Sequence, residues 1–323
     1  MAAGPWHHTA GGFRNPPGSP PRGGDFGDWT SFFMRRFGGT ETPAVPDGHV
    51  LPPDEALAGL QRQRGPDSLT WLGHASFLIR LDGRTILTDP FLSRHASPIP
   101  PFGPERFAPP GLTPAQLPPV DILLLSHNHY DHLDLPTIEA LPAKEHTQVL
   151  VPLRLGPYFT SRGFGRVREM DWHDQAVVAG IEVISLPAIH FSKRTLFDRN
   201  RTLWAGYAVQ SSRKRLLFAG DTGYGPMFPQ LGRNARPFDT ALLPIGAYEP
   251  RLLMGAVHVN PEEAVQIGRD LNAGRLVGMH WGTIQLTEEP PFEPPGRFRA
   301  AARAAGYADD QVWVMRIGET RAL

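Results

Sequence analysis

The feature that most constrains the fold is an apolar run that ends in a cluster of imidazoles and carboxylates. Residues 120–126, VDILLLS, have the continuous apolar pattern of a buried strand. The residues that follow supply His127, His129, Asp131 and His132 in the pattern H-x-H-x-D-H. Imidazoles and carboxylates packed together cost desolvation and titrate against one another, so stability alone rarely accounts for them. The segment is therefore either a solvated polar loop rich in histidine or the site of a cation.

Three further residues of the same kinds stand where other apolar segments end: His190 after IEVISLPAI, Asp221 after RLLFAG and His280 after RLVGM. Alternate residues leaving a strand point the same way, so His127 and His129 can hold one ion. One zinc needs only three or four ligands, so this larger set predicts two ions. Asp221 is the expected bridge, because a carboxylate has two oxygens. The alternative is that these histidines are satisfied separately in polar loops.

Charge and composition exclude several classes of function. The chain has 323 residues, with 32 Lys+Arg balanced by 32 Asp+Glu, so no overall field favours nucleic acid. It has no cysteine, which excludes disulfides and thiolate chemistry and suits a reducing compartment. Neither a signal peptide nor a long apolar span is evident. We expect a cytoplasmic chain whose membrane contact, if any, is peripheral.

The N-terminal residues 1–66 are rich in proline and glycine and are expected to form a partly ordered arm. Within it, His7 and His8 are expected to be disordered and without a role. DWTSFFMRRFGG (28–39) favours a short helix docked on the main domain. The alternative is an aromatic and basic patch that contacts lipid or a subunit partner, such as a second copy in a homodimer. Residues 67–323 are expected to form the catalytic domain.

This domain is predicted to be rich in strands with occasional helices. Asn260, Pro261 and Glu263 form the capping signature of a helix that Gly274 ends. Many strands with few helices favour packed sheets with helices outside, an α+β fold. Apart from 120–126, the predicted strands are 69–73, 76–81, 83–90, 147–152, 181–187, 203–209, 215–221, 239–245, 275–281 and 312–317.

Several motifs resemble the metallo-β-lactamase superfamily: TWLGHASFLI, LTDP, SHNHYDHLD, GDTG and MHWGT. Others resemble its group of phospholipases D that hydrolyse N-acyl-phosphatidylethanolamine: RNRTLWAGY, FAGDTGYGP, LLPIGAYEPR and HVNPEEAV. Together they span residues 70 to about 290. This resemblance implies a four-layer αββα sandwich with two Zn²⁺ ions, or iron or manganese, at the edge between the sheets. It assigns His127, His129 and His190 to one ion, Asp131, His132 and His280 to the other, and Asp221 to both.

The resemblance also implies an activity. Water is the nucleophile, and it attacks a phosphodiester in a phospholipid to release phosphatidic acid and an N-acylethanolamine. No side-chain nucleophile is required, which agrees with the absence of cysteine and of a Gly-x-Ser-x-Gly motif. Animal members have a polar residue before the histidine of HVNPEEAV, whereas this chain has Val257.

Five residues are candidates for supporting roles. Asp89 is expected to accept an N–H from a ligand histidine, or else to form a turn before proline. His74 is expected to be a hydrogen-bonded histidine that lines the site. His258 is expected to contact the substrate and donate a proton to the leaving group, or else to face solvent. Tyr130 is expected to face the lipid headgroup or to pack beneath its loop. Asp131 is expected to pass a proton in addition to binding metal.

Three other functions use the same motifs. The first is a metallo-hydrolase of a sugar-phosphate lactone or another small ester. The second is an RNA-cleaving nuclease, against which the neutral charge and the absence of a basic run argue. The third is a non-catalytic metal-binding protein, against which the complete ligand set argues.

Overall fold

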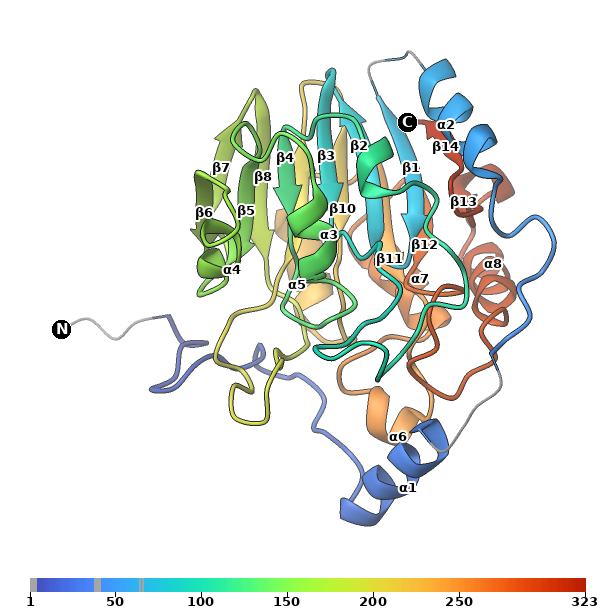
Figure 1. Cartoon of the computed structure of the whole chain (residues 1–323). Coiled ribbons are helices and arrows are strands. Elements are labelled where there is room, and N and C mark those ends of the chain that lie inside the picture. The colour runs from blue at the N-terminus through green and yellow to red at the C-terminus, as the bar shows by residue number, and fades with distance from the viewer. Residues whose placement is uncertain (1–4, 38–41, 64, 66) are drawn as a thin grey trace.

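The computed structural model describes residues 5–37, 42–63, 65 and 67–323. Two mixed sheets pack face to face with helices on their outer faces, which confirms the predicted αββα sandwich (Figure 1). Within the described residues each sheet has seven strands. In spatial order the first contains β14 (Thr320–Ala322), β1 (Ser68–Gly73), β2 (Ser76–Leu81), β3 (Arg84–Thr88), β4 (Ile122–Leu124), β5 (Gln148–Pro152) and β6 (Arg166–Met170). The second contains β13 (Val312–Trp313), β12 (Leu276–Met279), β11 (Thr240–Pro244), β10 (Arg215–Phe218), β9 (Gly206–Gln210), β8 (Ile181–Leu186) and β7 (Gln175–Val178).

The core follows from strand alternation. Phe77 and Ile79 of β2 belong to the cluster between the sheets, whereas Leu78 belongs to the cluster beneath the outer helices. Both faces of β2 are therefore buried. Its near-continuous apolar sequence reflects this burial.

The outer layers are formed by short helices. The first sheet is covered by α2 (Pro53–Arg62), α3 (Leu135–Ala140) and α4 (Gly156–Thr160), and the second by α5 (Met227–Asn234), α7 (Pro261–Asp270) and α8 (Pro294–Ala304). Two more helices, α1 (Phe26–Phe37) and α6 (Arg251–Met254), pack against each other through Phe32, Leu253 and Met254. Among the described helices, none combines the length and apolar character needed to span a membrane.

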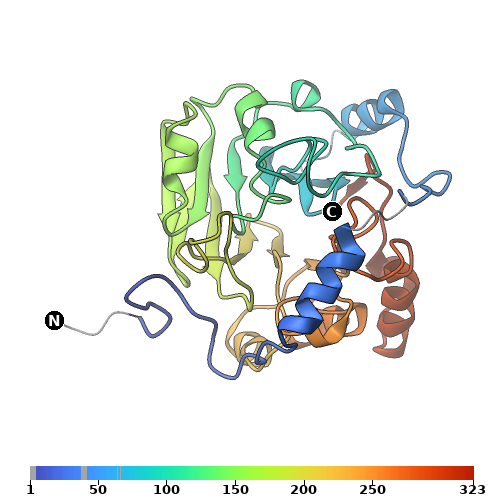
Figure 2. The same ribbon diagram turned by 60° about the horizontal axis from the view of Figure 1, so that its bottom comes forward.

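Parallel pairing brings several strand ends to one end of the molecule. β3, β4 and β5 are parallel neighbours in the first sheet, and β10, β11 and β12 are parallel neighbours in the second. The segments that leave β3, β4, β10 and β12 carry Asp89, His127, Asp221 and His280. Figure 2 brings this end of the molecule forward, with α1 crossing in front of it. The sheet topology therefore brings these sequence-distant residues together.

The N-terminal arm packs against the sandwich. The prediction that His7 and His8 are disordered is wrong, because their Nε2 atoms lie 2.6 and 2.7 Å from the two carboxylate oxygens of Asp171. His7 and Phe13 are buried. The helix predicted at 28–39 forms as α1 and docks on α6, although Gly38 and Gly39 lie outside the described residues. The proposed division at residue 66 stays a prediction.

Three strands were not predicted: β6, β7 and β14. All three are edge strands, and β6 (RVREM) alternates exposed arginines with partly buried residues. An edge strand with charged side chains lacks the continuous apolar run by which the other strands were predicted. Only the pairing with neighbours in the sheet defines these segments as strands.

The predicted capping of α7 is confirmed. The Asn260 side chain accepts a hydrogen bond from the Glu263 N–H, and the Glu263 carboxylate accepts one from the Asn260 N–H. Both groups satisfy backbone donors that the first helical turn leaves without partners.

We predict that Asn260→Ala lowers the free energy of unfolding by about 1 kcal/mol, because it removes this cap. Asn260→Asp keeps an acceptor at the same position and is expected to retain most of the stability. Urea unfolding followed by circular dichroism measures both. Equal stabilities for Asn260→Ala and the unsubstituted protein would show that the cap does not stabilise the fold.

Candidate metal centre

The seven predicted ligands converge at one end of the sandwich. Together with His74 they form two groups of four side chains, and within each group all ligand atoms lie within 4.8 Å of one another. One group contains His127, His129, His190 and Asp221, and the other contains His74, Asp131, His132 and His280. The two sets of three ligands assigned to separate ions thus lie in separate groups, while the binding of an ion by each set stays a prediction.

The first group presents three ring nitrogens toward one another. His129 Nδ1 lies 2.8 Å from His127 Nε2 and 3.3 Å from His190 Nε2. Burial lowers the pKa of His127 and of His190 well below the ordinary value, and lowers that of His129 to about 3. The rings are therefore neutral near pH 7, which is the form in which imidazole binds a metal.

The second group contains a carboxylate between two rings. Asp131 Oδ2 lies 3.4 Å from His132 Nε2 and 3.5 Å from His280 Nε2. Burial acts to lower the pKa of both histidines. The carboxylates of Asp221 and Asp131 outweigh it, raising the pKa of His132 well above its ordinary value and that of His280 to about 9. Buried carboxylates here require positive charge, which either protonated imidazoles or a metal ion can supply.

Asp221 joins the two groups. Its Oδ2 lies 3.2 Å from both His132 Nε2 and His280 Nε2, 3.8 Å from His190 Nε2 and 3.9 Å from His127 Nε2. Its Oδ1 is buried and has no hydrogen-bond partner among the described residues. A buried carboxylate oxygen without a donor, surrounded by imidazole nitrogens, fits a bound cation. These residues therefore fit the metal ions that the sequence predicts.

A second layer of hydrogen bonds orients the ligands. His132 Nδ1 donates to Asp89 Oδ2 at 2.7 Å, and His190 Nδ1 donates to the Val257 carbonyl at 2.9 Å. Both bonds leave Nε2 facing the cluster. His74 Nε2 donates to Asp131 Oδ2 at 2.8 Å. Because Val257 contributes its carbonyl, this contact does not depend on the Val257 side chain.

The backbone at the site is unusual. His74, Asp89 and His280 have positive φ angles of 55°, 32° and 62°. For residues other than glycine this conformation costs on the order of 1–3 kcal/mol each, and such residues cluster at functional sites. Gly220 has a φ of 60°, and a Cβ there would lie 2.8 Å from Ser126 Cβ. The glycine before Asp221 is therefore required for the turn that brings this carboxylate into the cluster.

Two residues at the site were not predicted. Asn15 of the N-terminal arm accepts hydrogen bonds through Oδ1 from the His190 N–H and from Trp204 Nε1, both at 3.0 Å. The Ser126 N–H donates a hydrogen bond to Asp89 Oδ1, and the Ser126 Oγ lies 2.8 Å from His127 Nδ1. Ser126 directly precedes the histidine motif and could have been suspected from that position. No sequence spacing connects Asn15 with His190.

His258 and Tyr130 border the cluster. His258 Nδ1 lies 4.0 Å from Asp221 Oδ2 and has no hydrogen-bond partner among the described residues. Burial lowers the pKa of His258 to about 4. The half-buried Tyr130 donates its hydroxyl to the Arg194 carbonyl at 2.8 Å, and the Arg194 guanidinium lies 3.9 Å from its ring centroid. The roles predicted for both residues stay predictions.

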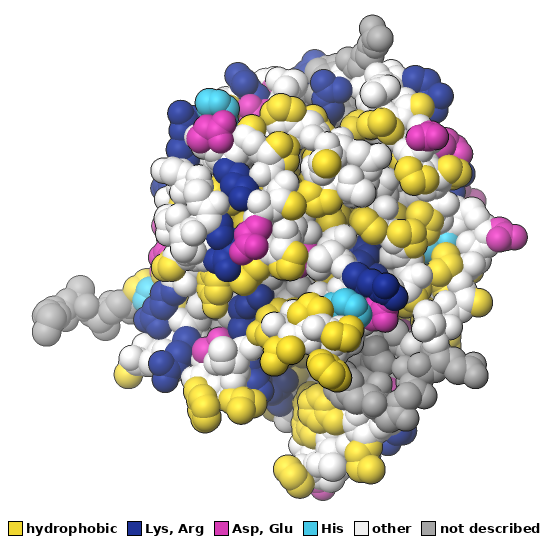
Figure 3. Space-filling view, in the orientation of Figure 1, with side chains coloured by type: hydrophobic (Ala, Val, Ile, Leu, Met, Phe, Trp, Pro, Cys, Tyr) yellow, Lys and Arg dark blue, Asp and Glu magenta, His cyan; other side chains and the backbone are white. Residues whose placement is uncertain are grey.

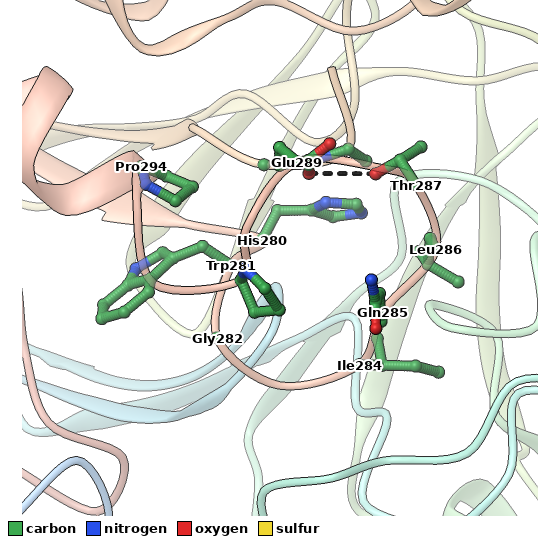
Figure 4. A pocket seen from close by; sticks show the side chains of 12 residues that line it. His280, Trp281, Gly282, Ile284, Gln285, Leu286, Thr287, Glu289 and Pro294 are labelled. Carbon is green, nitrogen blue, oxygen red and sulfur yellow. Dashed lines mark hydrogen bonds between the residues drawn. The ribbon is translucent and has the colours of Figure 1, made fainter. Parts of the chain in front are cut away.

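A small cavity adjoins His280 (Figure 4). Its volume is about 20 Å³, which is room for a single water molecule. Beside the His280 ring, Thr287 donates a hydrogen bond to Glu289 at 2.9 Å. This cavity is too small for a substrate.

We predict that the purified protein carries close to two equivalents of transition metal and that His129→Ala loses at least one. The substitution removes one of three imidazoles in a group, and fewer ligands hold an ion less tightly. Elemental analysis by mass spectrometry measures the metal content. The matched control is His146→Ala, because the His146 side chain is 75% exposed and is not part of either group. Equal metal loss in both variants, or no metal in the unsubstituted protein, would contradict the assignment.

Comparisons with known proteins agree with this geometry. Residues 84–281 match the family described as the beta-lactamase superfamily domain. An uncharacterised protein of Mycobacterium tuberculosis is 44% identical over 73% of this chain and 64% of its own length. The chain thus covers less than two thirds of that relative. N-acyl-phosphatidylethanolamine-hydrolyzing phospholipase D 1 of Caenorhabditis elegans is 38% identical over 71% of this chain and 68% of its own length.

A solved structure supports the fold. Igni18, a metallo hydrolase of Ignicoccus hospitalis, aligns with a TM-score of 0.59 at 23% identity, covering 80% of this chain and 98% of its own. The αββα architecture, the family match and the relatives lead to one assignment. This chain belongs to the beta-lactamase superfamily.

Proposed function

We propose that this chain is a metal-dependent phosphodiesterase of phospholipase D type that hydrolyses N-acyl-phosphatidylethanolamine-like lipids to phosphatidic acid and an N-acylethanolamine. The observation that carries the proposal is the convergence of seven ligands in two adjoining groups that share Asp221. A structural site needs a closed set of about four ligands for one ion, whereas two adjoining groups suit chemistry on a phosphodiester.

In this proposal one group of residues holds each ion. His127, His129 and His190 bind the first, and Asp131, His132 and His280 bind the second, with Asp221 shared. Two divalent ions lower the pKa of water and offset charge on a phosphoryl group. Asp89 and His74 orient the ligands through their hydrogen bonds to His132 and Asp131. A set of imidazoles and carboxylates suits Zn²⁺, and iron and manganese accept the same ligands.

The lipid substrate is supported by two observations. The Caenorhabditis elegans relative named for this reaction is 38% identical. Large apolar side chains are exposed on α1 and on the loop that follows His190: Phe26, Met34, Leu196 and Phe197. Exposed apolar side chains of this size are suited to peripheral contact with a lipid surface. The protein would then act at the membrane surface, with Tyr130 and His258 near the headgroup.

We predict that the metal-loaded protein releases phosphatidic acid from N-acyl-phosphatidylethanolamine in mixed micelles. In water enriched in ¹⁸O, the label is expected in phosphatidic acid, because water attacks phosphorus and the N-acylethanolamine oxygen is the leaving group. Mass spectrometry of both products gives the result. Hydrolysis confined to lactones or other small esters, with no turnover of the lipid, would contradict this proposal. It would favour the alternative function, a metallo-hydrolase of a small ester.

We predict that His258→Gln lowers the rate of lipid hydrolysis by roughly a hundredfold, because it changes a polar contact beside the reacting phosphoryl group. Its metal content is expected to match that of the unsubstituted protein, since His258 is not one of the seven assigned ligands, although its ring lies within 4.8 Å of ligand atoms of Asp221 and His280. His173→Gln, at an exposed position, is the control. Loss of metal together with activity would show that His258 acts on the ions and not on the substrate.

A further inference from the structure

Two arginines from distant parts of the chain converge on one aromatic ring beside the metal centre. The guanidinium carbons of Arg22, from the N-terminal arm, and Arg199, from the loop after β8, lie 4.8 and 4.5 Å from the ring centroid of Phe191. That ring lies 4.5 Å from the His129 ring and 4.9 Å from the His190 ring, between centroids. One aromatic ring therefore separates this pair of cations from the predicted metal ligands.

Neither guanidinium group has an anionic partner among the residues that the structure describes. Within the described part of the chain, neither Arg22 nor Arg199 has a carboxylate oxygen within 4.0 Å, and neither side chain has a hydrogen bond. Other exposed arginines do have such partners, as Arg35 does with Glu288 and Arg303 with Asp309. Burial and the charge of Arg199 lower the pKa of Arg22 to about 10. Two neighbouring cations repel one another, and an anion between them would relieve that repulsion.

Each arginine lies close in sequence to exposed apolar side chains. Phe26, four residues after Arg22, is 88% exposed, and Leu196 and Phe197, just before Arg199, are 80% and 84% exposed. Figure 3 shows hydrophobic and basic side chains adjoining one another over the lower part of the face that it displays. Two cations alone would be sufficient to bind a free phosphate from water. Cations combined with exposed apolar side chains match a phospholipid, which presents both an anion and acyl chains.

We propose that Arg22 and Arg199 form a binding subsite for the anionic headgroup of a phospholipid at the mouth of the metal centre. The inference rests on the proposed function in taking a lipid as the ligand. A guanidinium presents a planar fork of donors that matches phosphate oxygens. The Phe191 ring contacts both guanidinium groups, and the Trp29 ring centroid lies 5.2 Å from the guanidinium carbon of Arg22. A phosphate would bind through the N–H groups that these rings do not cover. The subsite spans the arm and the loop, so the arm contributes to recognition of the lipid.

The test is co-sedimentation of the metal-loaded full chain with phosphatidylcholine vesicles, with and without phosphatidylglycerol. We expect the unsubstituted protein to bind the anionic vesicles more tightly, with an advantage that falls as salt increases. The double variant Arg22→Gln/Arg199→Gln is expected to lose affinity for anionic vesicles by on the order of thirtyfold. The control is Arg303→Gln/Arg316→Gln, which removes the same charge from exposed, paired positions. Melting temperature and metal content verify that all variants are folded.

The outcomes distinguish an incorrect subsite from an incorrect proposed function. If the protein hydrolyses the lipid but both double variants bind anionic vesicles equally, the subsite is wrong and the function stands. If only Arg22→Gln/Arg199→Gln loses vesicle binding while no lipid is hydrolysed, the subsite stands and the function is wrong. Isothermal titration calorimetry with inorganic phosphate tests whether the two arginines bind free phosphate and not a lipid headgroup. Phosphate binding that depends on the two arginines, without any preference for anionic vesicles, would overturn the lipid assignment.

Discussion

The structure depends on the balance of charge between two buried carboxylates and the imidazoles around them. Asp131 and Asp221 are nearly inaccessible to solvent, and a carboxylate in such a place is unstable without a cation or several donors. Asp221 Oδ2 faces ring nitrogens from both groups, while its Oδ1 has no hydrogen-bond partner among the described residues. Metal ions satisfy this arrangement better than protons, because one ion can bind several ring nitrogens and a carboxylate oxygen at once.

The scaffold supplies rigidity where these ligands leave the sheets. Parallel strands buried on both faces fix the starting points of the loops, and the second layer of hydrogen bonds fixes the rings. His74 lies in the turn between β1 and β2, and Asp89 and His280 directly follow β3 and β12, so a packed strand holds at least one side of each residue with a positive φ angle. The loops thus position polar groups that the sandwich could not accommodate in its core.

The N-terminal arm connects the site to its surroundings. It contacts Asp171 through His7 and His8, the His190 backbone through Asn15, and Phe191 through Arg22. These contacts extend from the connection between the edge strands β6 and β7 to the residues beside the candidate metal centre. The arm therefore packs beside the candidate metal centre and contacts the segment that carries His190 and Phe191.

The sequence by itself determined which residues are candidate metal ligands, most of the strands and the α+β class, because hydrophobic periodicity and the H-x-H-x-D-H spacing are local properties. It also placed His190, Asp221 and His280 at the ends of apolar segments. It did not reveal the edge strands β6, β7 and β14, whose identity comes from pairing with neighbours. Only the tertiary structure brought Asn15 to His190 and Arg22 to Arg199, because contacts between distant segments depend on how the whole chain packs.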